Sequence, residues 1–506
     1  MKKSVSSAMH AAPRTGFLLL FTLTAVLTPA RPQAWAQSIL QYHFSADRAG
    51  NYVVPELTLQ RARAIHLDSA FDGRVNGHVY AQPLLFKAAG HEVLVVATEN
   101  NFVEALDVAT GKPVWRQYLG PPATSSMLSC GNINPLGITG TPAIDEARQA
   151  IYLDAMVVTK RGPQHLVFGL SLENGQVRTG FPVNVADSLA ARRLKLIATD
   201  QNQRGALLIA HDTVYVPYGG HYGDCGSYHG WVVGIGLDND HRVLAWSTRA
   251  AGGGIWAPGG VVSDGHSLFV ATGNTFDTSQ WGGGEAVIRL GFDLNWLQSA
   301  RDYFVPSDWR ILDRRDADLG GTSPLPINLS SPGATYRFLV ALGKDGKAYL
   351  LNRDNLGGVG GDLASAEVSA NSIITAPVAF PAPDGRTFVV FPARGFKCTG
   401  AASSGSIDAL EFSARPAPAI SVSWCDPLEG DGTPIVTTTD GRSNPIVWIV
   451  GAEGDDRLHA FRGDNGKPVL AGLQVRLDGL RHFAPIVASR KRLFVAADGR
   501  IYAFKL

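Results

Sequence analysis

The sequence predicts an all-β protein, an eight-bladed β-propeller of four-stranded antiparallel blades whose ring is closed by its N- and C-terminal strands. Three observations predict this fold. A short motif recurs eight times, apolar strand patterns follow each copy, and the last copy lacks its fourth strand. Repeats of this kind bury their apolar faces by stacking on their neighbours, and closing them into a ring leaves few exposed edges.

The recurring motif is usually two small residues, a proline and then apolar residues. Its prolines are Pro83, Pro142, Pro258, Pro324, Pro377, Pro434 and Pro485, and residues 205–208 (GALL) fill the gap between the second and third. The other spacings are roughly 51 to 66 residues, a period typical of propeller blades.

A second strand is predicted after each motif, from VLVVAT at 93–98 to LFVAAD at 493–498. Nearly continuous apolarity indicates burial on both faces of the sheet. A third strand and a turn rich in Asp, Gly and Lys follow, as at 102–112, and a fourth strand carries Trp115 in the first unit. The last unit ends at Leu506, so residues 61–67 are well placed to supply its missing strand and remove the open edge.

Composition and the N-terminus indicate an exported protein. Lys2, Lys3 and Arg14 accompany an apolar run at 16–27, and Ala34-Trp35-Ala36 offers a cleavage site. We therefore expect a signal peptide at 1–36, a lead-in at 37–60 and the propeller at 61–506, in the periplasm or outside the cell. No later segment is long and apolar enough to cross a membrane. A formal net charge of +1 without basic runs gives nucleic-acid binding no electrostatic support.

Four cysteines in an exported chain favour disulfides over metal thiolates. Cys398 and Cys425 flank one predicted hairpin and form a natural pair. Cys130 and Cys225 lie in loops of neighbouring repeats. Four cysteines permit three pairings, which spacing alone does not settle, and neither C-x-x-C nor C-x-x-C-H occurs.

Four motifs in the middle of the chain resemble the PQQ- and calcium-dependent alcohol dehydrogenases. They are GGGIWAPGG at 252–260, LFVATGN ending at Asn274, DADLGGTSP from Asp316 and GKDGKAYLLNRDN from Gly343. A fifth segment, HYGDCGSYHGW from His221, matches the one that holds the family's acidic calcium ligand. The turn from Asp107 to Trp115 is similar to the family's tryptophan-docking motif.

The resemblance implies a role for each matching residue. Trp256 would form the floor under the quinone, and Lys344 would reach the quinone oxygens. Asp224, Asn274 and Asp318 would bind Ca²⁺, and Asp318 would also take the proton of the substrate hydroxyl. Ordinary alternatives stay open: a tryptophan that packs between blades, Asp and Asn as turn formers, and a solvated hairpin lysine.

The chain departs from the family's pattern in three ways. The family has two adjacent cysteines over the cofactor, whereas this chain has Ser129-Cys130, so we hypothesise that Cys130 bonds Cys225 and gives a different roof. The arginine that the family offers after that segment is absent. Asp224 replaces a glutamate and shortens the reach of a ligand. His221 and His229 bracket Asp224, but their spacing fits no known metal pattern and favours a polar loop lining.

Two functions of different classes stay open. The first is an exported quinoprotein dehydrogenase that uses PQQ and Ca²⁺ to oxidise an alcohol or sugar and passes electrons to a separate acceptor. The second is a non-catalytic propeller, an envelope scaffold or binding module with a protein or glycan partner. A hydrolase or lyase has no nucleophile motif behind it, because G-x-S-x-G does not occur.

Overall fold

The computed structural model describes residues 38–88, 91–238, 240–276, 279–331, 333–394, 405–470 and 475–506. They belong to the second of two compact units, Gln37–Leu506. The predicted signal peptide, residues 1–36, lies outside the described residues. Within the described ranges, none of the helices has the length and apolarity that a membrane crossing requires.

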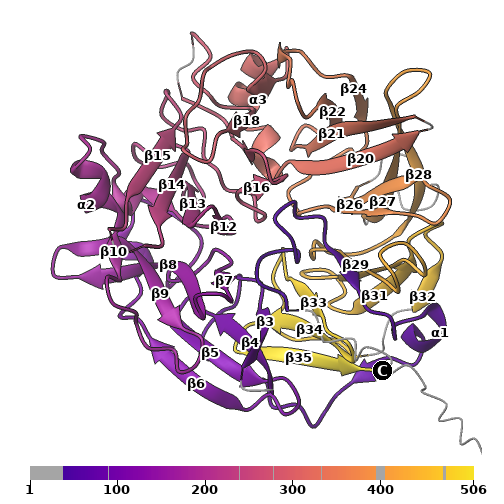
Figure 1. The fold of residues 1–506 in the computed structure, drawn as a ribbon, viewed down its shortest axis with the longest axis horizontal. Helices are drawn as coiled ribbons and strands as arrows, with labels where there is room; N and C mark the ends of the chain where they lie inside the picture. The colour runs from indigo at the N-terminus through magenta and orange to yellow at the C-terminus, as the bar shows by residue number, and fades with distance from the viewer. Residues whose placement is uncertain are drawn as a thin grey trace, which may run out of the picture. The chain divides into compact units, whose positions relative to one another are not determined.

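The second unit is an eight-bladed β-propeller (Figure 1). Blade 1 contains β3 (Leu84–Ala88), β4 (His91–Ala97), β5 (Phe102–Asp107) and β6 (Pro113–Tyr118), and blade 2 contains β7 (Ala143–Asp145), β8 (Ala150–Thr159), β9 (Gly162–Ser171) and β10 (Val183–Asn184). Blade 3 contains β12 (Leu208–Ala210), β13 (Thr213–Gly220), β14 (Trp231–Gly236) and β15 (Val243–Ser247), and blade 4 contains β16 (Val262–Ser263), β17 (Leu268–Ala271), β18 (Val287–Leu290) and β19 (Tyr303–Val305).

The second half of the ring repeats this order. Blade 5 contains β20 (Leu325–Ser331), β21 (Ala334–Leu342), β22 (Lys347–Asn352) and β24 (Ala364–Glu367), and blade 6 contains β25 (Val378–Pro381), β26 (Thr387–Ala393), β27 (Ser406–Ser413) and β28 (Ala419–Pro427). Blade 7 contains β29 (Ile435–Thr438), β30 (Ile446–Val450), β31 (Leu458–Arg462) and β32 (Pro468–Leu470), and blade 8 contains β33 (Ile486–Ala488), β34 (Arg492–Ala497), β35 (Arg500–Lys505) and β2 (His66–Leu67).

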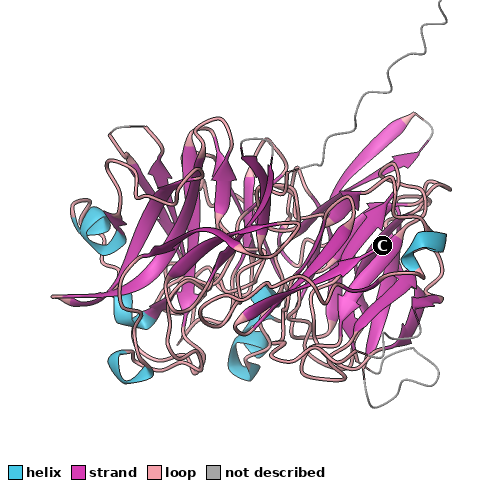
Figure 2. Ribbon diagram, turned by 90° about the horizontal axis from the view of Figure 1, so that it is seen from below, coloured by secondary structure: helices cyan, strands magenta, loops and turns pink. Residues whose placement is uncertain are grey.

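Short elements complete three sheets and several loops. The strands β1 (Asn51–Val53), β11 (Gln201–Asn202) and β23 (Gly358–Val359) are fifth strands on blades 7, 3 and 4. The α-helices are α1 (Leu59–Ala62), α2 (Val185–Ala190) and α3 (Trp309–Arg315), and the 3₁₀ helices are Ser125–Met127, Ala198–Asp200 and Leu319–Gly321. Figure 2 shows the sheets from the side, with loops gathered at both ends of the ring.

The structure confirms the repeat pattern and the ring closure. Each innermost strand begins within a few residues of the recurring motif, as β3 does directly after Pro83. The second strands are buried on both faces, and all five residues of β30 have no exposed surface. The strand β2 pairs antiparallel with β35, Leu67 opposite Phe504, so the N-terminal segment supplies the fourth strand of blade 8.

Tryptophans join neighbouring blades, as the docking motif predicted. Trp115 of blade 1 donates its indole N–H to the carbonyl of Leu172 in blade 2 at 3.0 Å. It packs on Gly175, where a Cβ atom would lie 2.5 Å from the indole. Trp424 of blade 6 repeats the contact on the carbonyl of Gly463 in blade 7, at 2.9 Å.

The lead-in passes through the centre of the ring, where its indigo trace is visible in Figure 1. We call residues 38–53 the axial segment. Its backbone bonds inner strands of five blades: Ile39 to Leu85, Leu40 to Ile144, Ala46 to Ser263, Ala49 to Ala379 and Gly50 to Val436. Its last part, β1, then runs parallel to β29. These bonds satisfy backbone groups on the axial edges of the inner strands, which would otherwise be unpaired.

Arg48 anchors the axial segment to blades 3 and 4. The residue is 2% exposed, and its guanidinium donates to the carbonyls of Leu207 at 2.9 Å, Val261 at 2.8 Å and Gly259 at 3.1 Å. A fourth bond reaches the carbonyl of Tyr42 at 3.1 Å, within the segment itself. A fork of fixed N–H donors is suited to gathering several carbonyls around one point.

Replacing this fork tests its contribution to stability. We expect Arg48→Met to lower the free energy of unfolding by about 2–4 kcal/mol, because several buried carbonyls lose their donor while the apolar stem is kept. Urea denaturation measures the change. The exposed Arg63→Met is the control, and equal midpoints for the two variants would contradict the anchoring role.

A buried polar network joins blades 2 and 3. His165 contacts the Asp154 carboxylate through Nδ1 at 2.7 Å and the Gln201 carbonyl through Nε2 at 3.0 Å. The Tyr218 hydroxyl donates to the other Asp154 oxygen at 2.9 Å. Both partners of the His165 ring are acceptors, so the ring is doubly protonated. Burial lowers the pKa of His165, but the Asp154 carboxylate outweighs it and the net pKa is raised.

This raised pKa predicts a pH-dependent stability. The contribution is fully present below the unfolded pKa of His, about 6.5, and is lost as pH rises through the higher folded pKa. We therefore expect the wild type to lose stability over that interval, by about 1.4 kcal/mol per unit of pKa difference. His165→Gln should flatten this slope in urea titrations, whereas the exposed His266→Gln should leave it unchanged. An unchanged dependence of stability on pH in His165→Gln would contradict the assignment of this dependence to His165.

Candidate active site

The predicted site residues lie at one end of the ring. Successive strands in each blade are antiparallel, so the loop before the innermost strand and the turn after the second strand share an end. Trp256 and Asp318 precede β16 and β20, respectively. Asn274 and Lys344 follow β17 and β21, and Asp224 follows β13. The topology thus gathers all five positions at what we call the Trp256 end.

Asp318 is the centre of the cluster. Its carboxylate is 3% exposed and accepts the indole N–H of Trp256 at 2.9 Å. The backbone N–H of Asn274 donates to its other oxygen at 3.1 Å, and the Lys344 ammonium lies 3.0 Å from the oxygen that Trp256 bonds. Four of the five residues taken from the resemblance therefore meet at one buried carboxylate.

Trp256 is half-buried in a glycine-rich loop. Gly252 and Gly253 have φ values of +83° and +64°, a left-handed conformation that side chains rarely adopt. Gly273 lies where a Cβ atom would be 3.0 Å from the Asp318 carboxylate, so a side chain there would crowd the carboxylate. The Lys344 Nζ stands 5.1 Å from the centre of the Trp256 ring. The result is a fixed π surface with a cation beside it.

A second buried carboxyl group lies close to Asp318. Glu285 has no exposed surface and accepts the backbone N–H of Leu319 at 2.7 Å. Burial, reinforced by the Asp318 charge, raises the pKa of Glu285 well above its usual range. Burial also raises the pKa of Asp318, although Lys344 opposes the effect. Lys344 bonds both Asp318 and the exposed Asp316, at 2.7 Å to the latter, and is the cation that balances the cluster.

Asp224 lies apart from this contact set. Its side chain is exposed and accepts the hydroxyl of Tyr228 at 2.6 Å. Burial, together with the charges of Asp224, Asp318 and Asp316, raises the pKa of Tyr228. Tyr228 is thus within electrostatic range of all three carboxylates and connects the Asp224 loop to the cluster.

The Cys130–Cys225 disulfide confirms the hypothesis for those two cysteines. Its Cα atoms are 5.9 Å apart, and it joins the loop before blade 2 to the loop that carries Asp224. Asp200 supports the same junction by accepting the Ser129 hydroxyl and the backbone N–H of Ser227. Cys398 lies outside the described residues, so its pairing with Cys425 stays a prediction.

The histidines that bracket Asp224 bond to backbone carbonyls. His221 Nε2 lies 3.1 Å from the Thr199 carbonyl and His229 Nδ1 3.2 Å from that of Thr248. In the described part of the chain, no three His, Cys, Asp or Glu side chains are grouped so as to hold a metal ion.

The cluster fits an anionic quinone better than it fits Ca²⁺. A planar cofactor needs a rigid π surface and a nearby cation, which Trp256 and Lys344 supply. A calcium ion needs several free oxygens, but both oxygens of Asp318 already accept hydrogen bonds and Lys344 neutralises the charge. The roles of Asp224, Asn274 and Asp318 as calcium ligands therefore stay predictions.

Sequence reasoning missed Glu285, Tyr228 and Arg48. Glu285 stands between a run of three glycines and an apolar strand, where a lone acid is a usable signal. Arg48 has no motif, because its carbonyl partners in blades 3 and 4 lie far away in the chain. Tyr228 lies in the HYGDCGSYHGW segment, four residues from its partner Asp224, but that match singled out Asp224 alone.

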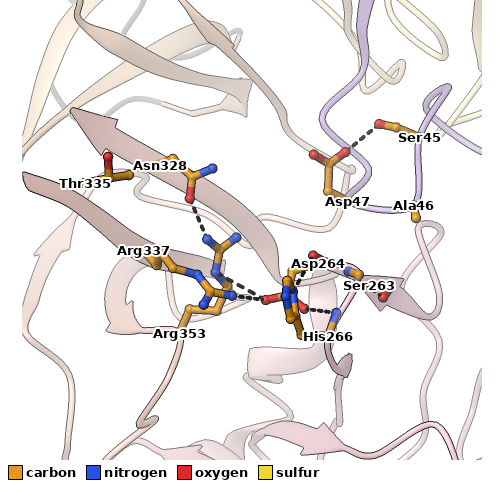
Figure 3. A pocket seen from close by; sticks show the side chains of 11 residues that line it. Ser45, Ala46, Asp47, Ser263, Asp264, His266, Asn328, Thr335, Arg337 and Arg353 are labelled. Carbon is orange, nitrogen blue, oxygen red and sulfur yellow. Dashed lines mark hydrogen bonds and ion pairs between the residues drawn. The ribbon is translucent and has the colours of Figure 1, made fainter.

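A polar pocket that is separate from the Asp318 cluster lies at the opposite end of the ring (Figure 3). Its volume is about 480 Å³, and the turn between β16 and β17 lines it together with β20, β21 and part of the axial segment. Asp264 bonds Arg337 at 2.8 Å and lies 3.5 Å from Arg353, whose Nη2 donates to Asn328. The two arginines are thus already paired, and none of the predicted site residues lines this pocket.

Comparison with known proteins identifies the fold. Neither a protein-family model nor a curated protein matches the sequence. Among solved structures, the quinohemoprotein alcohol dehydrogenase ADHIIG from Pseudomonas putida is similar, with a TM-score of 0.64, 12% identity and coverage of 93% of this chain and 80% of that one. The quinohemoprotein alcohol dehydrogenase from Comamonas testosteroni is also similar, with a TM-score of 0.63, 13% identity and coverage of 93% of this chain and 80% of that one.

A europium-containing methanol dehydrogenase is also similar, with a TM-score of 0.64, 13% identity and coverage of 93% of this chain and 98% of that one. At these identities the likeness establishes the fold. The chain is therefore structurally similar to the PQQ-dependent alcohol and methanol dehydrogenases, as the sequence resemblance predicted.

The charge balance at Asp318 yields a testable prediction. Without the Lys344 ammonium, the pKa values of Asp318 and Glu285 rise further above their unfolded values near 4. Groups with raised folded pKa values cost stability as pH rises through them. We expect Lys344→Met to lose about 2–4 kcal/mol relative to wild type at pH 8 and little at pH 4.

Urea titrations at the two pH values measure this difference. Lys344→Arg should keep most of the stability because it keeps the charge, and the exposed Lys160→Met is the surface control. An equal loss at both pH values would mean that Lys344 acts through packing alone.

Proposed function

We propose that the protein is an exported, PQQ-dependent oxidoreductase that oxidises an alcohol or a sugar. The observation that carries this proposal is the contact set at Asp318, in which a half-buried tryptophan and a lysine meet one buried carboxylate. The chemistry of these groups, the family order of their motifs and the fold of the similar dehydrogenases all support the same ligand.

Each residue has a defined task in this proposal. The bound quinone would supply a two-electron acceptor. Trp256 would stack on the planar ring and orient it, since Asp318 and the glycine-rich loop fix the indole. Lys344 would place positive charge beside the quinone oxygens, where negative charge develops on reduction.

Asp318 would act as the general base. The carboxylate must be ionised to accept a proton from the substrate hydroxyl, and its raised pKa brings it closer to the operating pH. Its hydrogen bonds to Trp256 and Asn274 hold it in place while the proton transfers. Glu285 would keep the Asp318 loop in position through its bond to Leu319.

The remaining parts of the proposal concern location and partners. The basic N-terminus, apolar run and cleavage motif support export to the periplasm or the exterior. Since the sequence holds no C-x-x-C-H motif, electrons would leave to a separate acceptor.

A non-catalytic propeller is the second candidate. The observation that favours it is the saturation of Asp318: both oxygens are hydrogen-bonded, and Lys344 occupies the position beside them. Such a ring would act as an envelope scaffold or binding module for a protein or glycan partner.

Calorimetric titration of PQQ into the mature protein separates the two functions. We expect saturable binding that Trp256→Ala weakens at least about 10-fold, because the stacking surface is lost. The exposed Tyr222→Ala, at the same end of the ring, should bind like wild type. Asp318→Asn should retain PQQ but lose turnover of alcohols and sugars with a dye acceptor by about 100-fold or more.

The same titration is run with calcium and with a chelator. PQQ binding that persists with chelator would mean that Lys344 balances the charge of the bound quinone. Calcium-dependent PQQ binding would instead support the predicted ligands Asp224, Asn274 and Asp318. No heat under either condition would leave the scaffold as the function.

A further inference from the structure

A small cavity lies at the Trp256 end, next to the axial segment. Its volume is about 20 Å³, and it is lined by Tyr42, Tyr80, Thr139, Thr141, Arg204, Pro258 and Phe483. All except Tyr42 lie in loops that lead into inner strands, so the cavity is on the axis of the ring. This volume admits a pair of oxygen atoms but not a whole ligand.

The Arg204 guanidinium is the charged group in this cavity. It stacks 4.6 Å above the Phe483 ring and donates no hydrogen bond to any other described residue. Burial lowers the pKa of Arg204 to about 10, which still leaves it positive at neutral pH. Other buried cations of the described chain differ, since Arg48 bonds carbonyls and Lys344 bonds carboxylates.

Among the described residues, no carboxylate lies within ion-pair distance of Arg204. The carboxyl group whose charge acts on it is Glu99, which is completely buried. Burial raises the pKa of Glu99 to about 7, and its Oε2 accepts the backbone N–H of Gly137 at 2.7 Å. Arg204 therefore keeps unused donors, and it lines the cavity.

The cavity is shaped to hold a group against these donors. The Thr141 hydroxyl accepts the backbone N–H of Gln82 at 2.8 Å, so its own hydrogen is available to an acceptor. Phe483 has a φ of +67°, an unusual conformation for a bulky residue that places its ring under Arg204. Arg481 lies over the Tyr80 ring at 5.5 Å, but it does not line the cavity and is paired with Asp498.

Arg204 is close to the proposed quinone floor. A Cβ atom on Gly205 would lie 2.8 Å from Gly260 and 3.1 Å from the Ala257 carbonyl, so the two loops touch. Ala206 donates its N–H to the Pro258 carbonyl at 2.9 Å. Pro258 lines the cavity and is two residues from Trp256, so the Trp256 loop forms part of the cavity wall.

We infer that Arg204 binds a carboxylate of the ligand that lies over Trp256. The inference rests on the proposed function and adds to it that the ligand carries an acidic arm. A planar guanidinium pairs with the two oxygens of a carboxylate. PQQ is a tricarboxylic acid, and Arg204 supplies from another loop the cation that is missing after Cys130.

The test compares PQQ with its trimethyl ester, which keeps the ring and loses the charges. Calorimetry on the wild type should show PQQ binding about 10- to 100-fold tighter than the ester. Arg204→Gln should remove this preference and leave ester binding within about twofold. Arg204→Lys, which keeps charge without the planar fork, should retain part of the preference. The exposed Arg193→Gln is the matched control.

The possible outcomes are distinct. A preference that Arg204→Gln abolishes, with an unchanged urea midpoint, supports the carboxylate site. Equal affinity of the wild type for PQQ and ester, or an undiminished preference in Arg204→Gln, overturns the site and leaves quinone binding intact. If Arg204→Gln does not fold, Arg204→Lys decides, since an unchanged preference there also overturns it. Failure of the wild type to bind either compound overturns both the proposed function and this site.

Discussion

The Arg48 guanidinium and the axial segment around it determine how the centre of this ring is filled. Eight inner strands meet at an axis, and their backbone groups need partners there. The axial segment bonds five of them in turn, and Arg48 gathers carbonyls from the loops into blades 3 and 4. One of these carbonyls belongs to Gly259, in the loop that carries Trp256. The position of the candidate site thus depends on the axial segment, which precedes all eight blades in the sequence.

A filled axis leaves the chemistry to the two ends, and these ends differ in charge balance. At the far end, Asp264 lies between two arginines and the charges are paired. At the Trp256 end, Asp318 and Glu285 are buried beside a single ammonium, Lys344, while Arg204 keeps unused donors. Buried groups with incomplete partners cost stability, and proteins keep them chiefly where they do chemical work. This asymmetry favours the Trp256 end as the site of function.

The sequence was sufficient for the fold because the fold is repetitive. The recurring motif marked every inner strand. The last copy lacked a fourth strand, which predicted that residues 61–67 would close the ring. Trp256, Asn274, Asp318 and Lys344 could be predicted because each stands in a local motif. Arg48 and Arg204 could not, since their partners lie in other blades. The path of residues 38–53 through the centre of the ring could not be predicted either, because a short irregular segment has no periodic pattern.

A crystal structure of the mature protein grown with saturating PQQ is the most direct test of this account. We predict electron density for the quinone stacked on Trp256, with Lys344 beside the quinone oxygens and one carboxylate in the cavity at Arg204. Density in the pocket between Asp264 and Arg337 instead, or an unchanged Trp256 end at full PQQ concentration, would contradict the central claim that this end of the ring binds an acidic quinone.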